Sequence, residues 1–209
     1  MEQTYAIELK NITKRFGKIV ANDGINLKVK RGEILSLLGE NGSGKTTLMN
    51  MISGIYFPDE GHILVDGKAV SIRSPKDSFD LGIGMIHQHF KLIDVMTAAE
   101  NIILGLKGNA VLDMKKVHKD IQELVHRYGF DLVPAQKEYT MSVSQKQTVE
   151  IVKMLYRGAN VLILDEPTAV LTPQEVDKLF EVLRNMRDDG RAIIIITHKL
   201  NEVLELSDR

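Results

Sequence analysis

One segment of this 209-residue chain has the composition and spacing of a phosphate-binding loop. Residues 39–46 read GENGSGKT and match the pattern G-x-x-x-x-G-K-[ST]. The glycines let backbone N–H groups curve around an anion, and a following helix would point its positive end at that anion. Lys45 supplies a charge for the β- and γ-phosphates, and the Thr46 hydroxyl is a ligand for Mg²⁺. The nucleotide contacts predicted here are Gly39, Asn41, Gly42, Ser43, Gly44, Lys45, Thr46 and Thr47.

Two carboxylates and a histidine each follow a strongly apolar segment later in the chain. Residues 161–164 are Val-Leu-Ile-Leu, and Asp165 and Glu166 come next. We expect Asp165 to hold Mg²⁺ through water, and Glu166 to position or deprotonate the water that attacks the γ-phosphate. His198 follows the apolar segment 193–197, and ligand-contacting groups gather at the carboxyl ends of parallel strands. Its imidazole is therefore predicted to hydrogen-bond Glu166 and the γ-phosphate.

The elements that must position these side chains alternate between strand and helix patterns. Short β-branched runs bounded by glycine predict an antiparallel layer early in the chain, at residues 6–11, 26–30 and 61–66. Buried strands are predicted at 33–38, 161–164 and 191–197, and helices at 44–53, 173–188 and 199–206. Thr172 is the expected N-cap of one of these helices, with Pro173 as its first residue. This alternation predicts an α/β fold with a mostly parallel sheet covered by helices.

The pattern changes between residues 97 and 129, where apolar residues fall at helical spacing and β-branched runs are absent. This change predicts a helical segment inserted into the α/β core, with no linker separating two domains. The chain stops at Arg209, directly behind a predicted helix and without a closing strand. We therefore expect residues 1–209 to be one domain truncated at its C-terminus.

The composition narrows the classes of function. With 27 Lys+Arg and 28 Asp+Glu the formal net charge is −1, which argues against a sequence-independent nucleic-acid binder. The chain has no cysteine, which excludes a disulfide scaffold, a Cys-ligated zinc site and thiol catalysis and fits a reducing cytoplasm. No window approaches the ~20 apolar residues of a membrane-spanning helix. The sequence predicts a soluble protein or one that is peripheral to a membrane.

Taken together and in order, the motifs resemble those of the ATP-binding cassette (ABC) ATPases along essentially the whole chain. They are Phe16 in ITKRFG, the loop GENGSGKT, Gln88 in MIHQHF, the stretch MSVSQKQTVE, LILDEPT, and His198 in THKLNEV. The phosphate loop alone would fit kinases and GTPases, but the ordered set is specific. The stretches AAENIILG, YRGANVLILDEPTAVLTPQE and ITHKLNEV look like the importer subfamily for simple sugars and nucleosides. Members of that subfamily often carry two cassettes in one chain, and this sequence looks like the first.

The resemblance implies a P-loop fold with a mostly parallel core sheet, an N-terminal antiparallel β layer and an inserted α-helical subdomain. Residues 1–89 and 157–209 would form the core and the β layer, and residues 90–156 the helical subdomain that faces a permease. Phe16 would stack on adenine through its ring, with burial in the core as the alternative. Gln88 would reach Mg²⁺ and the attacking water, in a loop that senses the membrane partner.

The stretch at residues 141–145 departs from the family pattern. Relatives usually read Leu-Ser-Gly-Gly-Gln, or Leu-Ser-Val-Gly in this subfamily, whereas this chain reads MSVSQ. In the family this signature presents backbone N–H groups to the γ-phosphate of a second cassette, so Ser142, Ser144 and Gln145 are assigned to nucleotide binding. Ser144 stands in place of a glycine, and its Cβ can obstruct such a close approach.

Two further positions differ from the subfamily. Thr148 stands where an arginine is usual, and Thr172 where an aspartate is common. Because two cassettes of this family pack head to tail, a weakened signature here would serve the ATP of the partner cassette. We therefore expect two unequal sites, with hydrolysis retained on the site built from Lys45, Asp165 and Glu166.

The function implied by the resemblance is an ATPase that uses ATP and Mg²⁺ to power an importer of simple sugars or nucleosides. Its implied partners are transmembrane permease subunits, a second cassette in the other half of the chain and, indirectly, a substrate-binding protein, with no nucleic acid. Its implied place is peripheral, on the cytoplasmic face of the cell membrane. Nothing in a cassette contacts the cargo, so the choice between sugar and nucleoside stays open.

Two other classes of function are alternatives to this one. An ATP-binding regulatory cassette without hydrolysis is favoured by Ser144 and Thr172 and opposed by the intact Glu166 and His198. A DNA-associated cassette ATPase of the repair or condensation type would carry long coiled coils. The chain has no sustained heptads and a balanced charge, which both oppose it.

Overall fold

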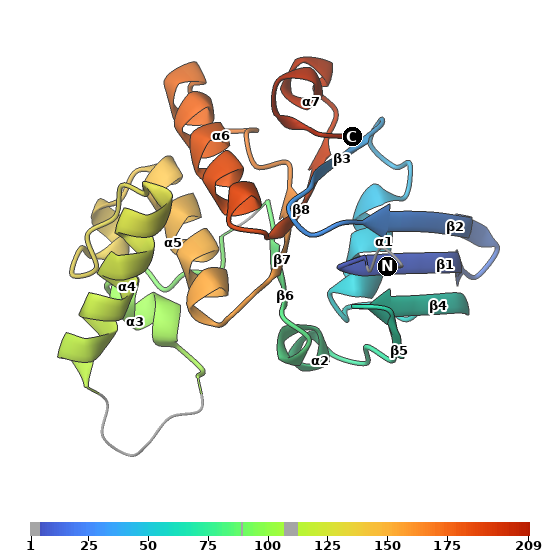
Figure 1. The fold of residues 1–209 in the computed structure, drawn as a ribbon, viewed down its shortest axis with the longest axis horizontal. Helices are drawn as coiled ribbons and strands as arrows, with labels where there is room; N and C mark the ends of the chain where they lie inside the picture. The colour runs from blue at the N-terminus through green and yellow to red at the C-terminus, as the bar shows by residue number, and fades with distance from the viewer. Residues whose placement is uncertain (1–4, 89, 107–112) are drawn as a thin grey trace.

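The computed structural model describes residues 5–88, 90–106 and 113–209, and its strands form two four-stranded sheets (Figure 1). The antiparallel sheet has the order β2-β1-β4-β5, with bounds β1 Ile7–Phe16, β2 Ile19–Val29, β4 Glu60–Val65 and β5 Lys68–Val70. The parallel sheet has the order β3-β8-β7-β6, with bounds β3 Ile34–Leu38, β6 Ile83–Ile86, β7 Val161–Asp165 and β8 Ala192–Thr197. The predicted combination of a parallel core sheet and an antiparallel layer is confirmed.

The helix bounds are α1 Lys45–Ile52, α2 Pro75–Asp80, α3 Ala98–Ile103, α4 Met114–Tyr128, α5 Val143–Tyr156, α6 Pro173–Asp188 and α7 Leu200–Leu206, with a short 3₁₀ turn at Glu138–Thr140. α3, α4, α5 and α6 form a group on the side of the parallel sheet away from the antiparallel sheet, whereas α1 lies beside the antiparallel sheet (Figure 1). Thr172 caps α6 and Pro173 begins it, as predicted. Among the described residues, no helix combines the length and the apolar character needed to cross a bilayer.

The parallel sheet is buried on both faces between two hydrophobic cores. One core lies against α5, α6 and the other helices, and the other lies against α1 and the antiparallel sheet. Successive residues of a strand point to opposite faces, so Ile193 and Ile195 of β8 enter the first core and Ile194 the second. This burial on both faces explains the continuous apolar sequence of β7 and β8.

Strand bounds differ from the sequence prediction where the pairing is irregular. β1 and β2 pair along most of their lengths, well beyond the predicted 6–11 and 26–30. Their register shifts three times, at Leu9/Ile12, Ile12/Lys14 and Lys14/Arg15. Such irregularities break the period of two on which a strand prediction depends. β3 is less buried than predicted: its first two residues are buried, but Leu38, its last residue before the phosphate loop, is exposed.

The segment predicted to be helical from 97 to 129 is not one continuous helix. α3 ends at Ile103 and α4 begins at Met114, and residues 107–112 between them lie outside the described part of the chain. The broader range 90–156 also includes non-helical backbone, and Thr97 forms an isolated β-bridge with Lys137. α2, β5 and β6 are short elements of six, three and four residues that the sequence pattern did not predict.

Candidate functional site

Strand register brings the carboxyl ends of three parallel strands to one edge of the sheet. Leu38, the last residue of β3, pairs with Thr197, the last residue of β8. Asp165, the last residue of β7, pairs with Ile196 of β8. The phosphate loop, the second carboxylate and the histidine each follow one of these strand ends. The fold therefore gathers groups that lie more than 150 residues apart in the sequence.

The predicted phosphate loop encloses the ammonium group of Lys45. Its Nζ donates hydrogen bonds to the carbonyl oxygens of Gly39 at 2.7 Å and Glu40 at 2.8 Å, and to Ser43 Oγ at 3.2 Å. α1 begins at this lysine, and no side chain in the described part of the chain caps its first N–H groups, whereas α3, α5 and α6 all have capping boxes. Uncapped N–H groups at a helix N-terminus suit an anion.

The loop rests on strand β2, a support that sequence reasoning missed. Asn22 is buried, and its Nδ2 donates to the carbonyl oxygen of Gly44 at 3.2 Å. Gly44 has φ +85°, and a Cβ there would collide with the carbonyl oxygen of Ala21 and lie 2.9 Å from Asn22 Nδ2. Only glycine suits this position, for both backbone conformation and space. No motif spacing reveals such a contact, because it depends on where β2 packs.

Replacing Gly44 with alanine is expected to destabilise the fold more than the same change at Gly42. Gly44 has φ +85° and Gly42 has φ +86°. Each substitution therefore lowers the free energy of unfolding by roughly 1–2 kcal/mol, because alanine is strained in a left-handed conformation. A Cβ at Gly42 has nothing within 4 Å, whereas one at Gly44 meets β2, which adds roughly 1–3 kcal/mol. Urea unfolding of the two variants measures this difference. Equal losses of unfolding free energy would contradict the packing account.

Glu166 has an unusual backbone conformation that orients its side chain. It has φ +49°, and its N–H donates to the Ile196 carbonyl at 2.9 Å, so the chain turns sharply as β7 ends. Glu166 Oε1 lies 2.9 Å from His198 Nδ1, as predicted for this pair. The carboxylate is 12% exposed and the imidazole 51%. Within the described residues Glu166 Oε2 is buried and has no hydrogen-bond partner, so it can accept a proton or a hydrogen bond from water.

Asp165 is the second acid at this edge. The pKa of Asp165 is raised above its ordinary value. Burial is the largest cause and the nearby Glu166 adds to it, whereas the Thr46 hydroxyl and Lys45 oppose it. A partly buried carboxylate beside a hydroxyl and a glutamine offers the oxygen ligands that Mg²⁺ prefers. Thr46, Asp165 and Gln88 line one cavity, so the donor set predicted for Mg²⁺ fits that ion.

This cavity has a volume of about 630 Å³, enough for a nucleotide triphosphate tail. Its lining residues are Ile19, Val20, Ala21, Asn41, Gly42, Ser43, Gly44, Lys45, Thr46, Thr47, Gln88, Asp165, Glu166 and Ile196. Most of the predicted phosphate, metal and catalytic residues thus come together. Gly39 contributes through its carbonyl bond to Lys45, and His198 through Glu166.

Phe16 lies beside this cavity but does not line it. It ends β1, pairs with Ile19, and is 41% exposed, so burial in the core does not describe it. Its ring packs edge-on against Tyr56, with centroids 5.2 Å apart, and Lys14 Nζ lies 5.4 Å from its centroid. Ile19, the partner of Phe16, lines the cavity, so an adenine bound at that end of the cavity would lie near the Phe16 ring. The stacking role of Phe16 stays a prediction.

A second support missed by sequence reasoning is Glu202 in α7. Its Oε1 accepts from Thr168 Oγ1 at 2.5 Å and its Oε2 from Thr197 Oγ1 at 3.2 Å. Lys199 Nζ lies 3.0 Å from the same carboxylate. Glu202 thereby ties the loop after Glu166 to Thr197, the last residue of β8, which directly precedes His198. The spacing of these residues gives no signal for the contact, which joins segments 34 residues apart.

Residues 22–169 match the sequence profile of the ABC transporter family. The chain belongs to this family. The match covers most of the chain and includes the phosphate loop and both acids. ABC ATPases have a parallel core sheet, an antiparallel layer and a helical portion, and this chain has the same fold.

Curated relatives of this ABC transporter chain are import ATP-binding proteins. It is 51% identical to the nucleoside import ATP-binding protein NupA of Lactococcus lactis, over 100% of this chain and 42% of the relative. It is 52% identical to the guanosine import ATP-binding protein NupO of Bacillus subtilis, over 98% and 41%. The ribose import ATP-binding protein RbsA 2 of Escherichia coli O157:H7 is 42% identical, over 100% and 42%. The chain thus spans about two fifths of the length of these relatives.

Solved structures of ABC transporter cassettes share the fold. The ADP conformation of MJ1267 has a TM-score of 0.86 and 26% identity, and covers 98% of this chain and 85% of that one. The dimeric structure of MJ0796, a bacterial ABC transporter cassette, has a TM-score of 0.80 and 27% identity, over 97% and 91%. The first structure is an ADP conformation and the second is a dimer.

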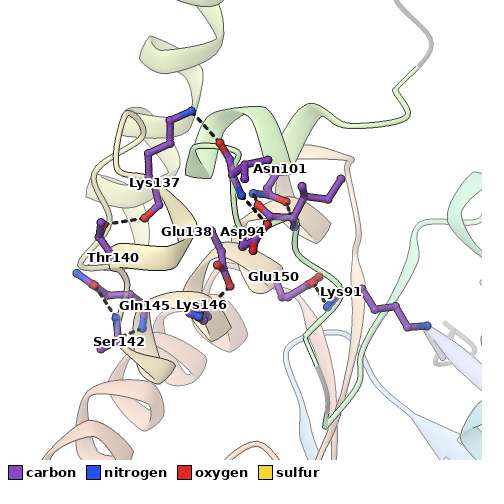
Figure 2. Close-up of polar contacts among 12 residues, drawn as sticks. Lys91, Asp94, Asn101, Lys137, Glu138, Thr140, Ser142, Gln145, Lys146 and Glu150 are labelled. Carbon is purple, nitrogen blue, oxygen red and sulfur yellow. Dashed lines mark hydrogen bonds and ion pairs between the residues drawn. The ribbon is translucent and has the colours of Figure 1, made fainter.

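The signature of this ABC transporter chain lies at the start of α5, away from its own phosphate loop. Ser142 is the N-cap: its Oγ accepts from Gln145 N–H at 3.2 Å, and Gln145 Oε1 accepts from Ser142 N–H at 3.1 Å (Figure 2). With Ser144 they line a different cavity of about 360 Å³ between α5 and α6. The structure therefore does not bring Ser142, Ser144 and Gln145 to the phosphate loop of the same chain.

Buried acids hold the surrounding segments to α5. Glu150 Oε1 accepts the N–H of Lys91 at 2.9 Å, which fixes the segment following Gln88 to this helix (Figure 2). Glu138 pairs with Lys146 at 2.9 Å, which ties the 3₁₀ turn before the signature to the same helix. A carboxylate buried with a hydrogen-bond partner fixes its neighbours, because leaving it unpaired is costly. The signature and the Gln88 segment are thus attached to one helix.

Proposed function

We propose that this chain binds ATP with Mg²⁺ and hydrolyses it to power the import of a nucleoside or simple sugar. The main support is the pair Glu166 and His198, whose Oε1 and Nδ1 atoms lie 2.9 Å apart. The pair lies at the same edge of the sheet as the phosphate loop and the uncapped N-terminus of α1. Phosphate-binding loops occur in many proteins, but this acid–histidine pair adds a means of activating water. The import function rests on the likeness to NupA, NupO and RbsA, which are named for such transport.

The geometry suggests how hydrolysis proceeds. Lys45 and the N–H groups of α1 bind the phosphate tail. His198 holds Oε1 of Glu166, which leaves the buried Oε2 to accept a proton from water as its oxygen attacks the γ-phosphorus. The bond from that phosphorus to the β,γ-bridging oxygen breaks, giving ADP and phosphate. Thr46, Asp165 and Gln88 would hold Mg²⁺, which neutralises charge on the phosphates.

In this proposal the second half of each site comes from another cassette. The location of Ser142 away from the phosphate loop of its own chain supports this, as does the dimeric state of the similar cassette MJ0796. We propose that residues 90–156 form the subdomain that faces the permease, with the chain on the cytoplasmic face of the membrane. The Gln88 segment would pass the opening and closing of the dimer to that partner.

ATP-driven uptake by membrane vesicles containing the full-length protein and its permease tests this function. We expect nucleoside or sugar accumulation to require ATP and Mg²⁺, and EDTA to abolish both accumulation and phosphate release. Because Mg²⁺ neutralises the phosphates, its removal should stop hydrolysis while some ATP binding persists. Phosphate release without accumulation of either cargo would retain the ATPase and refute the importer.

A regulatory cassette without hydrolysis is the second candidate, and Ser144 in the signature favours it. The same phosphate-release measurement separates the two functions. Binding of ATP with no release of phosphate above the uncatalysed rate would favour the regulatory cassette over the importer ATPase.

A further inference from the structure

Ser144, which replaces the usual glycine of the signature, is engaged in a chain of hydrogen bonds. Its Oγ donates to Glu175 Oε1 at 2.6 Å and lies 2.9 Å from Ser142 Oγ. The other oxygen of this carboxylate, Oε2, accepts from the N–H of Thr172 at 2.9 Å and from its hydroxyl at 3.0 Å. Two of the residues that depart from the family pattern, Ser144 and Thr172, thus meet on one carboxylate.

The direction of each bond follows from counting hydrogens. A carboxylate only accepts, so the single hydroxyl hydrogen of Ser144 points to Glu175. Hydrogen bonds from Ser144, then from Thr172, lower the pKa of Glu175, which keeps this acceptor ionised. Ser144 Oγ then accepts from Ser142, which uses the only hydroxyl hydrogen of Ser142. Ser142 Oγ itself accepts from Gln145 N–H, so the hydrogen bonds run in one order, from Gln145 through Ser142 and Ser144 to Glu175.

This order has a consequence for any phosphate that approaches the signature. Ser142 is exposed, but its hydroxyl has only lone pairs left to offer. Phosphate oxygens are also acceptors, so the two groups cannot bond while Ser142 donates to Ser144. With glycine at position 144 there would be no hydroxyl to occupy the hydrogen of Ser142.

We propose that Ser144 and Glu175 form a lock that withholds the Ser142 hydroxyl from the γ-phosphate of the opposite cassette. Glu175 is a positioning residue in this scheme, since it acts only through Ser144. This inference rests on the proposed function, in which the signature completes the ATP site of a second cassette. Closure of the dimer must then break the bond between Ser142 and Ser144. The lock therefore opposes closure of the site that this signature completes, which holds the ATP of the opposite cassette.

Removing the Ser144 hydroxyl tests the lock as a gain of affinity. In the full-length protein with its permease, closure of the dimer precedes hydrolysis, so a lock on one site raises the ATP concentration that hydrolysis at the other requires. Ser144→Ala is therefore expected to lower the ATP concentration for half-maximal hydrolysis by about two- to tenfold, the value of one net hydrogen bond. Glu175→Gln should change it in the same direction, because an amide can donate to Ser144 and still cap α6. Ser71→Ala makes the same chemical change at an exposed hydroxyl beyond the end of β5, where the Ser71 Oγ contact with Arg73 Nε is 3.2 Å, and it should change nothing.

Ser144→Gly separates the hydroxyl from steric obstruction by the Cβ. Equal gains from alanine and glycine support the lock. A gain from glycine alone means that the Cβ is the obstacle, and it overturns the lock, as does an unchanged or weaker affinity in Ser144→Ala. Thermal unfolding checks that each variant is folded. A wild-type assembly that hydrolyses no ATP would refute the proposed function, and the lock with it.

Discussion

Replacing Glu166 with glutamine in the full assembly is expected to lower ATP turnover by about 10²- to 10⁴-fold, the usual contribution of a general base. Glutamine can keep the hydrogen bond to His198, but an amide cannot take the proton of the attacking water. The buried Oε2, which has no protein partner within the described residues, is the atom whose basicity is lost. ATP binding should remain, because Lys45 and the phosphate loop are unchanged. Steady-state phosphate release and binding of a fluorescent ATP analogue measure the two effects.

Glu181→Gln provides the matched control, since it makes the same chemical change on the exposed surface of α6. It should leave turnover unaltered. The result also tests whether the two sites of the assembly are unequal. If hydrolysis is retained on the site built from Lys45, Asp165 and Glu166, this one substitution removes nearly all of it. Unchanged turnover in Glu166→Gln would refute both the base and the assignment of hydrolysis to this half.

Replacing Lys45 with methionine should weaken ATP binding by about ten- to a hundredfold, the value of a hydrogen bond to a charged group. Methionine keeps much of the length of the side chain but has neither charge nor donor. The carbonyl oxygens of Gly39 and Glu40, which Lys45 contacts, lie in a surface loop where water can replace the ammonium group. The fold should therefore survive while the affinity falls. Isothermal titration with ATP measures the change.

Lys68→Met removes an equivalent charge from the exposed strand β5 and serves as the control for net charge. It should bind ATP like the wild-type protein. Comparable affinity in Lys45→Met and wild type would mean that the nucleotide does not use the phosphate loop. A loss of thermal stability in Lys45→Met as large as that in Gly44→Ala would instead point to a structural role for the lysine.

The accuracy of the fold prediction depended on how regular each element is. β7 and β8 are buried on both faces and uninterrupted, so their apolar runs were readable within one residue. α6 was predicted at its observed bounds because Thr172 and Pro173 are strong start signals. β1 and β2 were truncated in the prediction, since their register shifts erase the alternation. Elements as short as β6 contain too few residues to show a period.

The site shows the same division between local and distant information. Lys45, Asp165 and Glu166 were identified because each is adjacent in sequence to the element that positions it. Asn22 and Glu202 were missed, because their contacts join segments 22 and 34 residues apart and follow only from the packing of β2 and α7. Neither asparagine nor glutamate at those positions carries a local signal.

The sequence by itself determined the family, the phosphate loop and the order of the acids and the histidine, because these depend on residue types beside a strand end. The tertiary structure decided which of those groups meet. It placed Glu166 Oε1 against His198, left Oε2 without a partner among the described residues, packed Gly44 against β2, and separated the signature from the phosphate loop. It also changed the meaning of Ser144, from a lost glycine to a hydroxyl bound to Glu175. A hydrogen bond needs two atoms within about 3 Å, and only the packed chain brings residues 144 and 175 that close.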